Sequence, residues 1–508
     1  MHTTARAVTT LTPFAIALQT LAQPIAPPPY DFAAADTLLT QNLPDFDGNV
    51  AVIIQQNGVD IYRYQAGTID FNTKNRLASF TKTISAGVIL SLIDDGKLAP
   101  TDRLSDTIPG FTGTTTDATI QQAWAMTHSF DNPAAFERSR DYTLAQSAAL
   151  IANTAFSVPD LNTVPGTTLF YDGNGMQTTG RIAELVTGLD WQTIARQRIL
   201  DPVGMPQADY EQFDPNPAVA GGLRSTANET ARYANMILNQ GVIDGARVLS
   251  EAAVETMFTN TTRDLPVSNT PFPDDPSLYP YNQNPDYTFG AWTLADNPVT
   301  GVVEEIMGAG AWGSFIWIDR RRGLTAVLIT DITPTTQSSR DPLFDLLNIT
   351  RQQATINQVA NLTAQDFGPD TRLSWQSPPN ATAARVYASN TPIRTVFDLR
   401  DAQRIATVVT TDANNQVVVP EANFYAVTTA FNGFENTAVN PLANTAPAPI
   451  QCRADVAVPY TVLDLSDINT FITAFNAADP LADIAPPFNV VDLTDIDAFI
   501  ASFTTGCR

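Results

Sequence analysis

The chain has 508 residues, of which 28 are Lys or Arg and 52 are Asp or Glu, so its formal net charge is −24. Hydrophobic residues make up 44% of it, which excludes a wholly disordered chain. The acidity argues against nucleic acid and against an anionic membrane surface as partners, because both need clustered basic side chains. The length predicts about two to four domains.

Residues 1–22 have the layout of a secretory signal peptide. Arg6 precedes an apolar stretch from Leu11 to Leu21, and small residues lie near Ala22. The stretch is too short to remain as a membrane span, and no run of about 18 apolar residues follows it. We therefore expect an exported protein, either secreted, periplasmic or at the cell surface, without a transmembrane segment. A buried amino-terminal helix is the alternative.

Residues 30–350 carry both strand and helix patterns. Asn49–Gln55 and Asp60–Gln65 flank the turn residues Asn57-Gly58, which predicts a β-hairpin. The apolar spacing of Thr81–Asp95 predicts a buried helix that ends at Gly96. Further helices are expected at Thr178–Val186 and Ala227–Leu238, and further strands at Phe315–Asp319 and Leu324–Thr330. Strands at both ends with helices between them predict an α+β, or mixed α/β, domain.

Residues 370–447 contain short alternating strands instead, which predict a small β-sandwich. The expected strands are Ala384–Ala388, Ile405–Thr410, Gln416–Pro420 and Asn423–Ala430. The segments Ser374–Asn380 and Phe424–Asn436 loosely resemble a fibronectin type III module.

Residues 452–508 contain an internal repeat, in which Ala454–Phe475 aligns with Ala482–Phe503. Each copy is expected to form a loop and one short amphipathic helix. The pair resembles a degenerate dockerin-like module with EF-hand-like spacing. Calcium loops place oxygen ligands at alternate positions, whereas Ala and Pro take several of those places here, so we expect no bound metal. The recurring acidic residues are Asp455, Asp464 and Asp467 in the first copy and Asp483, Asp492 and Asp495 in the second.

The two cysteines, Cys452 and Cys507, enclose this repeat. An even pair in an exported protein predicts one disulfide, and two free buried thiols are the alternative. The closed module is a candidate site for a cell-surface or protein partner.

The clearest chemical signal is Ser79-Phe80-Thr81-Lys82, at the start of the predicted Thr81–Asp95 helix. Positions i and i+3 of a helix share a face, so Lys82 should point to the same place as Ser79. A serine hydroxyl is a weak nucleophile, and a buried lysine that has lost its proton can activate it. Lysine is rare in this chain, and arginine cannot take that role. The alternative is an N-capping serine beside a solvent-facing lysine.

These residues belong to a series of ordered blocks that resembles the serine β-lactamase and penicillin-binding protein superfamily. The likeness is greatest to its class C β-lactamase, family VIII esterase and D-aminopeptidase branch, over about residues 40–345. It implies an antiparallel sheet flanked by helices, with a helical lobe. The blocks are LASFTKTISAGVILSLIDDGKL (77–98), TIQQAWAMT (119–127), PGTTLFYDGNGMQTTGRIAELVTG (165–188), ILDPVGM (199–205), AGGLRSTANETARYANMILNQG (220–241) and GAGAWGSFIWID (308–319).

The second motif of this superfamily, Y-x-N, falls on Tyr171-Asp172-Gly173. The tyrosine matches, and the resemblance implies that Tyr171 shares the proton transfers of Lys82 and protonates the leaving group. Gly173 takes the place of the asparagine, and Asn174 follows one residue later as a candidate substitute.

The third motif, K-T-G or H-x-G, falls on Gly308-Ala309-Gly310. The resemblance implies that Gly310 lets the substrate approach the strand, and that the N–H groups of Ser79 and Ala311 form the oxyanion hole. The cation that helps to hold the carboxylate of β-lactams and peptide stems is absent, since Gly308 takes its place. This loss argues against β-lactamase and carboxypeptidase activity in particular.

Composition independently excludes two other hydrolytic sites. The chain has no G-x-S-x-G elbow and, after the expected cleavage, one histidine, His128, so a Ser-His-Asp triad is not expected. One histidine without nearby cysteines also cannot build a typical zinc site. We interpret His128 as a structural or rim histidine and expect no cofactor.

The sequence therefore predicts a secreted serine hydrolase that cleaves an ester or amide through a Ser79 acyl-enzyme. Its substrate class is a small ester, an amide or a D-amino-acid peptide, with esterase activity favoured over true β-lactamase activity. The alternative is a non-hydrolysing acyl- or peptidoglycan-binding sensor with scaffold modules. The absent asparagine and cation favour this alternative, whereas the retained Ser79, Lys82 and Tyr171 oppose it.

Overall fold

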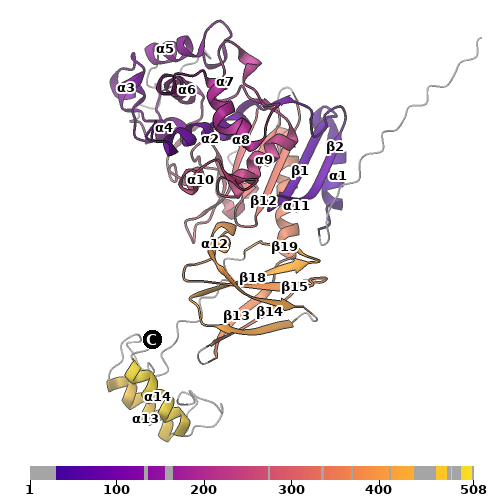
Figure 1. The fold of residues 1–508 in the computed structure, drawn as a ribbon, viewed down its shortest axis with the longest axis vertical. Coiled ribbons are helices and arrows are strands. Elements are labelled where there is room, and N and C mark those ends of the chain that lie inside the picture. Colours follow the sequence, from indigo (N-terminus) through magenta and orange to yellow (C-terminus); the bar gives the residue numbers. More distant parts are fainter. Residues whose placement is uncertain are drawn as a thin grey trace, which may run out of the picture.

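The computed structural model describes residues 30–130, 136–154, 164–272, 275–332, 337–367, 370–410, 414–439, 465–477, 482 and 493–505. The expected signal peptide, Cys452 and Cys507 lie outside these residues. Within them, no helix combines the length and apolar character that a membrane span requires. The mixed α+β fold class predicted from the sequence is confirmed (Figure 1).

A six-stranded antiparallel sheet with the order β2-β1-β12-β11-β10-β9 forms the centre of the first domain. The predicted hairpin is β1 and β2, and the two late strands predicted from the sequence are β11 and β12. The strands are β1 (Val50–Gln56), β2 (Val59–Ala66), β9 (Trp292–Asp296), β10 (Val303–Ala309), β11 (Phe315–Asp319) and β12 (Leu324–Ile329). Short pairs complete the domain: β3 (Asn75–Arg76) with β5 (Arg224–Ser225), β4 (Leu169–Phe170) with β8 (Val267–Asn269), and β6 (Val242–Ile243) with β7 (Ala246–Arg247).

Helices cover both faces of this sheet, so strands such as β1 are buried along their whole length. Alternate residues of β1 serve two cores: Ala51 and Ile53 join one, and Val52 and Ile54 join the other. The helices are α1 (Ala33–Gln41), α2 (Thr81–Asp94), α3 (Leu104–Thr107), α4 (Ile120–Trp124), α5 (Leu144–Thr154), α6 (Asn174–Thr187), α7 (Trp191–Ala195), α8 (Asp201–Val203), α9 (Ala227–Leu238), α10 (Glu251–Met257) and α11 (Gln337–Ile356).

The helix predicted over Thr81–Asp95 is α2, and it is buried on almost every side. Its apolar residues belong to the core that it shares with α6, α9 and the sheet. In Figure 1, α3 to α7 gather into a helical lobe beyond one end of the sheet, with α2 between lobe and sheet. Because α2 is buried and packed on several sides, the side chains of its first turn are held in fixed positions.

A β-module follows α11. Its three-stranded sheet has the order β13-β14-β17 and its four-stranded sheet the order β16-β15-β18-β19. The two sheets share a core that contains Trp375 and Tyr425, and the Tyr425 hydroxyl donates to the Pro420 carbonyl at 2.8 Å. The fibronectin type III likeness stays a prediction. The strands are β13 (Ala360–Phe367), β14 (Asp370–Gln376), β15 (Ala383–Ser389), β16 (Gln403–Val409), β17 (Asn414–Pro420), β18 (Phe424–Phe431) and β19 (Phe434–Asn436).

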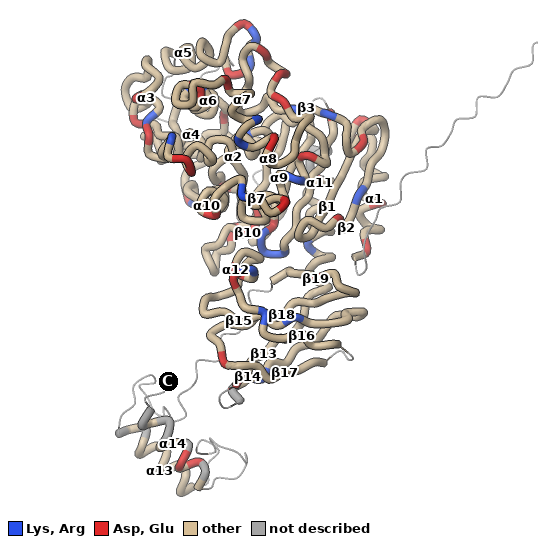
Figure 2. The backbone as a smooth tube through the Cα atoms, viewed as in Figure 1, with Lys and Arg blue, Asp and Glu red and all other residues tan. Residues whose placement is uncertain are grey.

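The β-module packs closely on the first domain. Its one described helix, α12 (Val396–Asp401), places Val396 and Phe397 in the core of that domain. The Phe397 ring meets Phe258 edge-on, and the Val396 N–H donates to the carbonyl of Arg320 in the β11–β12 turn. In Figure 2 this basic turn lies between the central sheet and α12.

The carboxyl-terminal repeat contributes two helices, α13 (Leu465–Asn476) and α14 (Leu493–Thr505). They pack through Phe471 and Phe499, whose rings stack with centroids 4.1 Å apart. One helix per copy agrees with the sequence pattern. The loops that hold most of the repeated aspartates lie outside the described residues, so the dockerin likeness and the disulfide stay predictions.

Candidate active site

Ser79 lies in a short 3-10 turn, Ala78–Phe80, that runs directly into α2. The preceding residue, Ala78, has a φ of +47°, in the left-handed region that non-glycine residues rarely adopt. Such a conformation costs on the order of 1–3 kcal/mol, and strained backbone of this kind concentrates at functional sites. The turn presents Ser79 to a pocket while Phe80 on its other side is fully buried.

Lys82 lies one helical turn after Ser79, and its side chain reaches back to the serine. Its Nζ donates to Ser79 Oγ at 3.0 Å and to the Ala220 carbonyl at 3.0 Å. Lys82 is only 5% exposed, and α2 and the core around it exclude water from its stem. The solvent-facing lysine considered as an alternative is therefore wrong.

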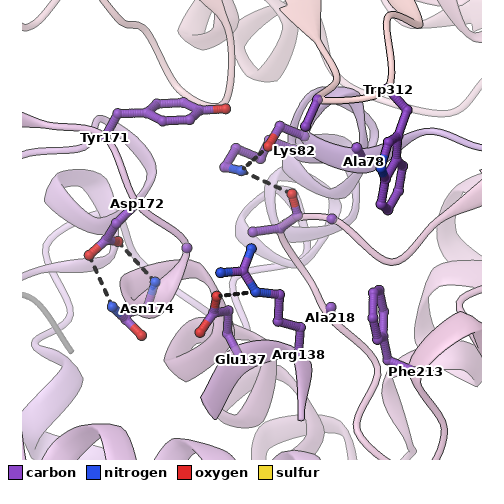
Figure 3. Close-up of a pocket in the computed structure, with 15 residues that line it drawn as sticks. Ala78, Lys82, Glu137, Arg138, Tyr171, Asp172, Asn174, Phe213, Ala218 and Trp312 are labelled. Carbon is purple, nitrogen blue, oxygen red and sulfur yellow. Dashed lines mark hydrogen bonds and ion pairs between the residues drawn. The ribbon is translucent and has the colours of Figure 1, made fainter. Parts of the chain in front are cut away.

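Tyr171 faces Lys82 from the other side of the pocket (Figure 3). It follows β4, and its ring packs on Trp292 at a centroid distance of 5.0 Å. The Lys82 Nζ lies 4.8 Å from the centroid of the Tyr171 ring. The structure thus brings Ser79, Lys82 and Tyr171 together from α2 and the β4–α6 connection.

Asn174, the candidate substitute for the missing motif asparagine, lines the pocket, but its amide is bonded to Asp172. Its Nδ2 donates to Asp172 Oδ2 at 3.1 Å, and its Oδ1 is buried without a hydrogen-bond partner among the described residues. Asp172 in turn bonds to the Nε2 of His128 at 3.0 Å. The Phe130 N–H reaches His128 Nδ1, so the proton belongs on Nε2 and His128 donates to Asp172. His128 is buried, as its structural interpretation predicts, and it fixes the segment that carries Tyr171.

The residues that follow β10 form the side of the pocket next to the Ser79 turn. A Cβ added at Gly310 would lie 2.2 Å from the Leu77 carbonyl oxygen, so only glycine fits between this strand and the Ser79 turn. Ala311 follows at the pocket wall, beside Ser79. The structure therefore places the two residues of the expected oxyanion hole on opposing segments that meet at Gly310.

Gly308, at the position of the superfamily's cation, lies against α2. A Cβ at this position would lie 2.2 Å from Thr83 Oγ1 on α2. Thr83 is held there because its hydroxyl donates to the Gly290 carbonyl at 3.0 Å. Any side chain at position 308 would therefore require the Thr83 side chain, which lies on a neighbouring helix, to move.

Gly310→Ala is expected to reduce kcat at least about 100-fold, because its Cβ would push the Ser79 turn away from Ala311, and losing one oxyanion donor costs about 10²–10³ in rate. The matched control is Gly221→Ala in the same pocket, where an added Cβ would lie 3.9 Å from the Ala78 carbonyl group. Kinetics of both variants, with circular dichroism to check folding, test this. Equal activity of the two alanine variants would contradict the close approach.

The pocket at Ser79 has a volume of about 540 Å³. Besides Lys82, Arg138 is the only basic residue among its described lining, and Glu137 pairs with it at 3.3 Å. Burial raises the pKa of the Glu137 carboxyl, and the positive charges of Arg138 and Lys82 oppose this rise. Figure 3 shows this pair below Lys82, with Phe213 and Trp312 beside it. Glu137, Arg138 and Phe213 lie in no sequence motif and were not predicted, whereas Trp312 follows Ala311 within the block at residues 308–319.

No group of three or more His, Cys, Asp or Glu side chains in the described part of the chain is arranged to hold a metal ion. The pocket lining offers hydroxyl, amine, phenol, carboxyl, amide and guanidinium groups.

The family model described as "Beta-lactamase" matches residues 40–348, more than half of the chain. The chain belongs to the β-lactamase family. Members of this β-lactamase family are serine hydrolases, and the match contains Ser79, Lys82, Tyr171 and the end of β10.

Two curated relatives of this β-lactamase family protein carry different functional descriptions. It is 28% identical over 213 residues to penicillin-binding protein 4 of Amycolatopsis lactamdurans, a match that covers 35% of this chain and 55% of that one. It thus spans about half the length of this relative. It is 24% identical over 307 residues to the 6-aminohexanoate-dimer hydrolase of Paenarthrobacter ureafaciens, covering 56% of this chain and 72% of that one.

A solved structure extends the likeness in fold. The octameric penicillin-binding protein homologue of Pyrococcus abyssi superposes with a TM-score of 0.51 at 15% identity, over 80% of this chain and 95% of its own. The shared fold is therefore longer than the region that the family model matches.

Proposed function

We propose that this protein is an esterase-type serine hydrolase that cleaves small uncharged esters through an acyl-enzyme on Ser79. The observation that carries the proposal is the 3.0 Å contact between Ser79 Oγ and the buried Nζ of Lys82. Burial of a lysine amine costs free energy. Activation of the serine nucleophile by proton transfer is a role that accounts for a lysine at this buried position.

In the proposed reaction, the Lys82 amine takes the proton of Ser79 Oγ, and the oxygen forms a bond to the substrate carbonyl carbon. The N–H groups of Ser79 and Ala311 stabilise the oxyanion that results. As the carbon–oxygen bond to the alcohol breaks, Tyr171 supplies the leaving oxygen with a proton and regains one from Lys82. Water then attacks the acyl-enzyme by the same steps and releases the acid.

Charge around the pocket favours uncharged substrates. Position 308 has glycine in place of a cation, Gly173 has no side-chain amide, and Asn174 is hydrogen-bonded to Asp172. The positive charge of Arg138 is partly offset by Glu137. A β-lactam carboxylate would thus lack its usual partners, whereas an ester needs only the nucleophile, the base and the oxyanion donors.

Intact-protein mass spectrometry after incubation with a fluorophosphonate tests this proposal. We expect one added phosphonyl group on the wild type and none on Ser79→Ala, together with ester turnover that Ser79→Ala abolishes. A protein that is labelled at Ser79 but leaves its esters unhydrolysed would be the acyl-binding sensor instead. Labelling that persists in Ser79→Ala would place the nucleophile elsewhere.

We also propose that the protein is exported through residues 1–22 and that a Cys452–Cys507 disulfide closes the carboxyl-terminal module. The repeat pattern of residues 452–508 and the packing of Phe471 on Phe499 support a compact unit that binds a cell-surface or protein partner.

A further inference from the structure

A second, smaller cavity opens beside Ser79, separate from the wide pocket that holds Lys82. Its volume is about 150 Å³, and it shares Ser79, Tyr171 and Ala311 with the wide pocket. The described side chains that line the rest are mostly apolar: Phe272, Met307, Ala309, Leu343 and Phe344.

The alternation of β10 explains why this wall is apolar. Gly308 faces Thr83 on α2, so Met307 and Ala309 face the opposite side of the sheet and join the core beneath α11. Leu343 and Phe344 come from α11 itself.

The polar atoms nearby are already engaged. Ser314 Oγ donates to the Thr330 carbonyl at 2.9 Å and accepts from the Thr330 N–H at 3.1 Å. Among the described lining residues, none carries a formal charge. The cavity therefore offers contact area to an apolar group and little to a charged one.

We propose that this cavity binds one arm of the substrate, a phenyl-sized apolar group bonded next to the reacting carbonyl. A dry protein cavity of about 150 Å³ with Leu and Phe walls is large enough for a benzene ring. The proposal rests on the proposed function, because it needs Ser79 as the nucleophile, and it adds the class of substrate: esters with a compact aromatic or branched apolar arm.

Boronic acids test the cavity with one arm at a time. Ser79 Oγ adds to boron, its proton passes to Lys82, and the adduct carries a single organic group. We expect phenylboronic acid to inhibit ester turnover at least about tenfold more tightly than methylboronic acid, because the ring leaves water. Equal inhibition constants for the two would overturn the proposal.

Two leucine variants give the matched comparison. Ala309→Leu fills the apolar cavity and is expected to remove the preference for phenyl, whereas Arg138→Leu puts the same side chain in the wide pocket and is expected to keep it. A third variant, Phe344→Ala, enlarges the cavity and is expected to improve naphthylboronic acid relative to phenylboronic acid. The same loss of phenyl preference in both leucine variants, or no naphthyl gain with Phe344→Ala, would contradict the assignment.

Fluorophosphonate labelling of each variant checks that the variant is folded and that its Ser79 remains reactive. If neither boronic acid inhibits and fluorophosphonate leaves Ser79 unmodified, the proposed function fails and this inference falls with it. If Ser79 is labelled but the phenyl preference is absent, only the inference fails.

Discussion

Lys82→Arg is expected to lower kcat for ester hydrolysis by about 10²–10⁴-fold, nearly as far as Lys82→Ala. The reason is that Arg keeps a positive charge but cannot accept the Ser79 proton, and general-base catalysis contributes a factor of that size. The Lys82 Nζ touches Ser79 Oγ, so an effect on catalysis and not only on stability is expected. Steady-state kinetics on purified variants measure it.

The chain offers its own control for this substitution. Lys97 is exposed near the end of the α2 segment, and Lys97→Arg should leave kcat within about twofold, since exposed substitutions away from special features have small effects. Near-normal turnover by Lys82→Arg would show that Lys82 only holds the Ala220 carbonyl and that another group is the base.

The second large effect concerns substrate choice. The kcat/KM for p-nitrophenyl butyrate should exceed that for a chromogenic cephalosporin on the same preparation by far more than tenfold. Each missing charge-assisted contact to a β-lactam is worth about 1.5–3 kcal/mol, or roughly 10–150-fold in kcat/KM. The missing side chains are those of positions 308 and 173, where this chain has glycine.

Two variants sharpen this comparison. Gly308→Lys alone should not restore cephalosporin turnover and should lower all activity, because its Cβ collides with the Thr83 hydroxyl. Arg138→Ala should change the ratio little, since Glu137 already pairs with that guanidinium. A faster cephalosporin reaction that Arg138→Ala abolishes would make Arg138 the carboxylate partner and contradict the proposed preference.

Local patterns predicted most of the elements around the site. The apolar spacing of α2, the hairpin β1–β2 and the strands β11 and β12 are properties of short continuous segments, and they are found where the sequence places them. The i, i+3 spacing of Ser79 and Lys82 likewise depends only on the helix between them.

What could not be predicted depends on contacts between segments far apart in the chain. The sequence shows that Gly308 replaces the superfamily's cation, but only the structure shows Thr83 next to that position. Asn174 follows the expected amide position by one residue and lines the pocket, but its Nδ2 is bonded to Asp172, which His128 holds in turn. Glu137 and Arg138 line the pocket although they belong to no recognisable sequence motif, because the tertiary fold brings their segment to Ser79.

The insertion of Phe397 into the first domain has a practical consequence for anyone who wishes to isolate the hydrolase. A gene truncated near residue 350 would delete a buried ring from the neighbourhood of Phe258 and expose the Arg320 carbonyl that Val396 covers. Removal of a core phenylalanine costs about 3–5 kcal/mol, a large part of the stability of an ordinary domain. The smallest fragment worth expressing therefore runs through residue 439, and a shorter one that proved inactive would say nothing about the chemistry at Ser79.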